Sequence, residues 1–97
     1  MKIEGLNELV TSWAGKPFKL ADGTELTLRV TLSELLSSFR PNGREASSNP
    51  GPVWRKLQSI EDSVDVTADE AQILEMVANQ NAFGFPAPVM ERVWHAL

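Results

Sequence analysis

The sequence predicts a single α+β domain that is predominantly helical, with a short N-terminal β-hairpin packed on three to four helices. The chain has 97 residues, which is enough for one hydrophobic core and too few for a second. Apolar residues recur at helical spacing in several segments after residue 27. Before residue 27, an alternating stretch leads into an Asp-Gly pair, which is a common hairpin signal.

Residues 1–26 are interpreted as a hairpin-like start. Polar and apolar side chains alternate over residues 16–20, Asp22 and Gly23 supply the turn, and residues 24–26 return as the second strand. Because two short strands are marginal in water, we expect this hairpin to lie against the helices. No internal repeat is evident in the sequence.

Residues 27–39 are predicted to form the first helix. Thr27 is suited to the N-cap, because its hydroxyl can accept a hydrogen bond from a free amide of the first turn. Pro41 follows soon after and ends the helix. One apolar stripe runs along this segment and comprises Leu28, Leu32, Leu35, Leu36 and Phe39.

Residues 40–52 are predicted to form a flexible loop rich in Pro, Gly, Ser and Asn. A connection of this length in a compact domain is typically functional or disordered. A short amphipathic helix is expected next, with Pro52 in its first turn. Its apolar face comprises Val53, Trp54, Leu57 and Ile60.

Residues 53–97 are predicted to be mainly helical. After a brief extended step at Val64 and Val66, Thr67 and Glu70 form a capping box at the start of the clearest helix. A last helix begins near Pro86 or Pro88 and reaches the final residue, so we expect that end to be docked. Its apolar side comprises Val89, Met90, Val93, Trp94 and Leu97.

Composition and charge exclude several classes of function. The chain has no cysteine, so disulfides and thiolate metal sites are absent. No export signal and no apolar stretch of membrane-spanning length is seen, which favours a cytoplasmic protein without membrane contact. Residues 1–56 carry eight Lys/Arg and six Asp/Glu, whereas residues 57–97 carry one and seven, a balance of +2 against −6. This asymmetry permits head-to-tail homo-oligomers or docking on a basic partner. The alternative interpretation is that the acidic residues form an ordinary solvated face.

The residues needed for catalysis are sparse, so we expect a protein that is not an enzyme and has no cofactor. His95 is the only histidine, and no Gly-rich phosphate loop is present. Asp62, Asp65 and Asp69 lack the turn glycine and the closing glutamate of a calcium loop, so we expect no metal site. A His95 that faced two carboxylates across a deep cleft would contradict this view.

Aromatic and basic residues outside the helical faces indicate where a partner binds. Trp54 and Trp94 lie on apolar faces and are expected in the core. Trp13 has no periodic partner and, with Phe83 and Phe85 near Gly84, is interpreted either as a core residue, which is favoured, or as an exposed anchor. The predicted protein-binding residues are Trp13, Arg40, Arg44, Phe83 and Phe85. The alternative is a nucleic-acid-binding regulator that uses Arg40, Arg44, Trp54, Arg55 and Lys56. It is disfavoured because Trp54 is expected in the core and the arginines are then ordinary solvated side chains.

The order of turn, cap and helix signals resembles an uncharacterised family of small proteins encoded in bacteriophage and prophage genomes. The matching segments are residues 14–17 leading to Asp22-Gly23, residues 25–28, residues 64–70 and residues 88–94. The resemblance implies an accessory protein that binds a host factor or a phage assembly component in the bacterial cytoplasm. A structural or assembly subunit of the virion is the other role that it implies.

Overall fold

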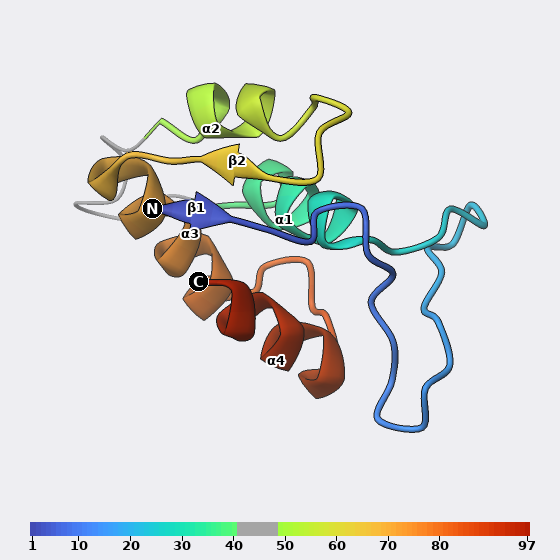
Figure 1. The fold of residues 1–97 in the computed structure, drawn as a ribbon. Helices are drawn as coiled ribbons and strands as arrows, with labels where there is room; N and C mark the ends of the chain where they lie inside the picture. The colour runs from blue at the N-terminus through green and yellow to red at the C-terminus, as the bar shows by residue number, and fades with distance from the viewer. Residues whose placement is uncertain (41–48) are drawn as a thin grey trace.

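The computed structural model describes residues 1–40 and 49–97 and shows an α+β fold that is predominantly helical, as predicted (Figure 1). Within these ranges the helices are α1 (Leu28–Ser37), α2 (Gly51–Lys56), α3 (Ala68–Gln80) and α4 (Ala87–Ala96). The strands β1 (Lys2–Ile3) and β2 (Val64–Asp65) pair antiparallel. None of the described helices combines the length and the apolar character that crossing a membrane requires.

The pairing of β1 with β2 joins distant parts of the chain. Met1 and Val66, 65 positions apart, exchange two backbone hydrogen bonds of 3.1 and 2.9 Å. The Leu6 amide then donates to the Asp62 carbonyl at 2.9 Å. The Arg29 guanidinium adds hydrogen bonds to the Asn7 side chain and to the backbone that follows α2. The first residues are therefore tied to the segment between α2 and α3.

Residues 9–27 form a projecting structure, here called the arm, that extends away from β1 and β2 (Figure 1). Its three extended segments meet in a ring of backbone hydrogen bonds. Val10 donates to the Leu26 carbonyl at 2.7 Å, Leu26 donates to Phe18 at 3.0 Å, and Phe18 donates back to Val10 at 3.2 Å. The predicted hairpin over residues 16–26 is present as the second and third of these segments.

The arm has two similar turns eight residues apart, a backbone similarity that the sequence did not indicate. Each of its two turns is a three-residue loop that ends in a glycine with positive φ, Gly15 at 83° and Gly23 at 88°. The glycine amides donate to the Ser12 and Leu20 carbonyls, both at 2.9 Å. This is the usual three-residue hairpin loop, a turn followed by a left-handed residue. The similarity lies in the backbone and the glycines, while the other side chains differ.

The hydrophobic core surrounds α1, which packs against α2, α3 and α4. The core is aliphatic apart from Phe85, and its helical residues occupy the predicted faces. Phe18 and Leu20 of the arm pack against it, as expected for the hairpin. The largest fully buried side chains include Ile3, Leu6, Leu26, Leu28, Leu32, Leu35, Leu57 and Leu74.

The predicted helix caps are confirmed. Thr27 Oγ1 accepts from the Val30 amide at 3.2 Å at the start of α1. Thr67 and Glu70 form the capping box of α3, with hydrogen bonds of 2.9 and 3.2 Å. Asn81, with φ of 43°, ends α3 in the left-handed conformation, which short polar side chains tolerate. These local signals determine where the two helices begin and where α3 turns toward α4.

Three side chains expected on buried helical faces are exposed instead. Trp54 is 39% exposed and Trp94 is 42% exposed. Each directly follows a buried valine, and successive residues of a helix point about 100° apart, so the indole lies at the edge of the buried face. Ile60 is 92% exposed, because α2 ends at Lys56 before the apolar spacing reaches it.

The arm turns give a first prediction, the replacement of Gly23 by alanine. The space around Gly23 is open, so a methyl group meets no atom within 4 Å, and the cost arises only from the positive φ. We expect Gly23→Ala to lower the free energy of unfolding by about 1 kcal/mol, measured by chemical denaturation. Gly23→Asn is the control and should lose less. An alanine variant as stable as the wild type would show that this backbone conformation is not required.

Candidate functional site

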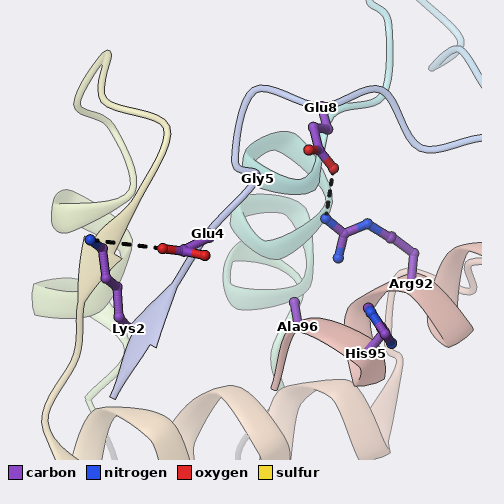
Figure 2. A pocket seen from close by; sticks show the side chains of 7 residues that line it. All are labelled: Lys2, Glu4, Gly5, Glu8, Arg92, His95 and Ala96. Carbon is purple, nitrogen blue, oxygen red and sulfur yellow. Dashed lines mark hydrogen bonds and ion pairs between the residues drawn. The ribbon is translucent and has the colours of Figure 1, made fainter.

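Two neighbouring hollows lie along α4, and together they are here called the α4 groove. Both hollows are open, and they meet at Arg92 and His95. The hollow beside the arm measures about 240 Å³ and includes Trp13. The hollow beside β1 measures about 300 Å³ and includes Lys2, Glu4, Gly5 and Glu8 (Figure 2). The groove thus brings together both ends of the described chain.

Trp13 lies at the first arm turn, and its side chain is the most exposed aromatic group of the described residues, at 73%. Its indole Nε1 donates to Glu91 Oε2 of α4 at 2.9 Å, a bond that spans 78 positions. The ring therefore has a polar partner on α4 although little of it is buried. A large apolar ring at a defined position on the surface is suited to contact a partner.

Arg92 forms the centre of the groove. Its Nη2 lies 3.2 Å from Glu8 Oε2, and Figure 2 shows the two side chains pointing toward each other from α4 and the turn after β1. Gly5 lies beneath this ion pair. A methyl group on Gly5 would stand 2.8 Å from Arg92 Nη2 and 3.0 Å from Glu8 Oε2, and its φ of 74° also favours glycine. Gly5 therefore allows the pair to lie close to the backbone.

His95 shares the second hollow with Glu4 and Glu8, but it is hydrogen-bonded to neither within the described ranges. Glu8 is paired with Arg92, and Glu4 Oε1 lies 3.8 Å from Lys2 Nζ. The hollow is open to solvent and is not the deep cleft that would contradict a non-enzymatic protein. That interpretation therefore stays a prediction.

The predicted protein-binding residues lie at separate places. Phe83 is 42% exposed and its ring stacks on Phe85 with centroids 4.3 Å apart. Phe85 itself is only 7% exposed, so its ring is a core side chain and its interpretation as an exposed anchor was wrong. Arg40 is exposed, and its backbone exchanges two hydrogen bonds with the Gln80 side chain. Arg44 lies outside the described residues.

The alternative nucleic-acid-binding residues are only partly available. Trp54 borders a small hollow of about 180 Å³ beside the end of α1, and Arg55 next to it is exposed. Lys56 is not a free cation, because its Nζ lies 2.6 Å from Glu70 Oε1. The predicted cluster therefore retains Arg40, Trp54 and Arg55 within the described part of the chain.

Sequence reasoning included Trp13 and considered His95, but it missed Lys2, Gly5, Glu8 and Arg92. Lys2, Gly5 and Glu8 belong to no recognisable motif, and Arg92 is 84 positions from its partner Glu8. One signal was present, since Arg92 is the only Lys or Arg after residue 56 in a strongly acidic half. A lone cation among carboxylates marks a position where a specific pairing is expected.

Comparisons with models of protein families, with curated proteins and with solved structures found no match to this chain.

The Lys56–Glu70 pair gives a prediction of pH dependence. The hydrogen bond from Lys56, followed by that from the Thr67 amide, lowers the pKa of the Glu70 carboxyl below its ordinary value of 4.5. A lowered pKa in the folded state stabilises the fold above the unfolded value, and this stability is lost as the pH falls through the folded pKa. Glu70→Gln should therefore be less stable than the wild type near neutral pH and lose less stability on acidification below pH 4.5.

The measurement is thermal unfolding across this pH range. Glu75→Gln, at an exposed carboxylate of the same helix, is the matched control and should follow the wild type. Parallel pH profiles for Glu70→Gln and the wild type would show that the pair contributes nothing to stability.

Proposed function

We propose that this protein is a non-enzymatic accessory protein that binds another protein through the α4 groove, with Trp13 as the anchor. The observation that carries the proposal is the position of Trp13, which is 73% exposed and yet hydrogen-bonded to Glu91 of α4. Tryptophan is enriched among the residues that dominate binding energy at protein interfaces. A ring that is already hydrogen-bonded also loses less freedom when a partner covers it.

The position of Trp94 supports the proposal that this surface binds a partner. Trp94 follows Glu91 by three positions on α4, so the two residues are neighbours on the helix, and it is 42% exposed. Glu91 is thus hydrogen-bonded to one exposed indole, from the arm, and is three positions from a second one on α4. The polar groups around them, Glu91 and Arg92, form a rim that can provide orientation, as in known interfaces.

The nature of the partner rests on the sequence resemblance. A bacteriophage or prophage origin supports a host factor or a phage assembly component as the partner, with the bacterial cytoplasm as the place of action. A role as a structural or assembly subunit of the virion is the alternative within the same origin. Self-association through the same groove would be expected for that role.

Nucleic-acid binding is the second candidate function, and the exposure of Trp54 beside Arg55 favours it. An exposed indole next to a guanidinium can stack on a base while the cation contacts phosphate. We expect any such binding to weaken steeply as salt increases, because phosphate contacts release counterions. A gel-shift titration at low and moderate salt measures this. A flat salt response, or no shift at low salt, would exclude the candidate.

Trp13→Ala tests the proposed function directly. We expect the variant to lose about tenfold or more of the partner recovered by affinity capture from bacterial lysate, as for a binding hot spot. Its melting temperature should stay close to that of the wild type, because only an exposed hydrogen bond is removed.

Trp54→Ala is the matched control, since it removes an exposed indole away from the α4 groove. It should retain the captured partner. Equal recovery by the wild type and Trp13→Ala, or equal loss by both variants, would contradict the assignment of the surface.

A further inference from the structure

The outer edge of β1 is an unpaired strand edge. In an antiparallel pair, residues alternate between those that exchange hydrogen bonds with the partner strand and those that turn their backbone groups away from it. Met1 exchanges both bonds with Val66, and Lys2 is opposite Asp65, so Lys2 and Glu4 direct their amides and carbonyls away from β2. Within residues 1–40 and 49–97, no backbone hydrogen bond beyond the β1–β2 pair engages either residue.

This free edge faces the α4 groove. Lys2, Glu4 and Gly5 form one wall of the hollow of about 300 Å³, and Arg92 and His95 of α4 form the other. Figure 2 shows β1 between the β2 segment on one side and the end of α4 on the other. A groove between a strand edge and a helix matches the recognition mode in which an extended peptide adds to a sheet as a further strand.

The charges at the groove indicate which side chain such a peptide carries. The Arg92 guanidinium makes a single 3.2 Å contact with Glu8, whose own side chain is 66% exposed. A guanidinium can donate two parallel hydrogen bonds to one carboxylate, which is the stronger arrangement. Glu8 therefore occupies the position of a replaceable carboxylate, and His95 lines the same hollow.

We propose that the α4 groove binds an extended segment of the partner protein that adds to β1 as a third strand and places a carboxylate, from Asp, Glu or a chain end, on Arg92 in place of Glu8. This inference rests on the proposed function and names its recognition mode. Backbone pairing with Lys2 and Glu4 supplies the strand geometry, and Arg92 supplies the preference for an acidic side chain. Trp13 borders the other end of the groove and contacts the remainder of the partner.

The experiment uses the full chain and a display library of random linear peptides. Selected peptides are synthesised, and their dissociation constants are measured by fluorescence anisotropy. We expect the selected peptides to share an acidic residue, and Arg92→Gln to weaken their binding about tenfold, as for loss of a charged hydrogen bond. Glu8→Gln should tighten binding, because it removes the competing carboxylate.

Glu4→Pro tests the strand edge itself. Proline removes the amide of residue 4, which faces the groove and not β2, so the β1–β2 pair is preserved. We expect about a tenfold loss of peptide binding, whereas Glu4→Ala, which keeps the amide, should bind as the wild type. Amide exchange at Lys2 and Glu4 should slow when the peptide binds.

A second measurement keeps the test valid if Glu4→Pro does not fold. Single amides of the selected peptide are replaced by esters, and at least one replacement should weaken binding to the wild-type protein. The proposal is overturned if no peptide is selected above the level that Glu4→Pro yields, or if neither the esters nor amide exchange report backbone pairing. It is also overturned if Glu4→Pro abolishes a concentration-dependent dimer while no peptide binds, since a second copy is then the occupant.

The outcomes separate this inference from the proposed function. Loss of the captured partner in Trp13→Ala, together with full recovery by Glu4→Pro, leaves protein binding at the groove in place and removes strand addition. Full recovery by Trp13→Ala removes the Trp13 anchor, whatever the peptide measurements show.

Discussion

The antiparallel pairing of residues 1–3 with residues 64–66 determines where the whole N-terminal third of the molecule lies. The pairing holds β1 beside the end of α4, and the hydrogen bond from Leu6 to Asp62 extends it toward the turn at Gly5. From there the chain enters the arm at a fixed position, with Leu28 donating to the Glu8 carbonyl where the arm returns. The wall of the α4 groove formed by Lys2, Glu4 and Gly5 depends on this closure.

The backbone hydrogen bonds of the arm are arranged differently from those of a sheet. Three extended segments of few residues each would be unstable as separate pairs, but the ring at Val10, Phe18 and Leu26 gives each segment two neighbours. Val10 and Leu26 are also buried, so hydrogen bonding and burial coincide at the root of the arm. The first turn can then present Trp13 to solvent without disturbing the core.

The parts of the fold that depend on near neighbours were predictable. The Thr27 cap, the capping box at Thr67 and Glu70 and the turn at Gly23 each arise within five residues, and all are present. Burial was less predictable, because neighbouring residues of a helix point about 100° apart. Trp54 and Trp94 each follow a buried valine and therefore lie at the edge of the core. The fold class followed from the apolar periods, which do not depend on such details.

The candidate site was largely beyond the reach of sequence reasoning. The contacts of Arg92 with Glu8 and of Trp13 with Glu91 span 84 and 78 positions. Neither pair forms part of a local pattern, and only the completed tertiary structure places their partners together. Trp13 was predicted because it belongs to no apolar period. That pattern indicates a side chain outside the helical faces, but it does not indicate which residue the side chain contacts.

The exposure of all three tryptophans has a practical consequence for fluorescence measurements on this protein. The indoles of Trp13, Trp54 and Trp94 are in contact with water in the native state, while the interior is formed mainly by aliphatic side chains. The wavelength of maximum tryptophan fluorescence therefore shifts only modestly when the chain unfolds, and circular dichroism is the better measure of thermal unfolding. The same emission is a sensitive record of any molecule that covers one of these rings and excludes solvent from it.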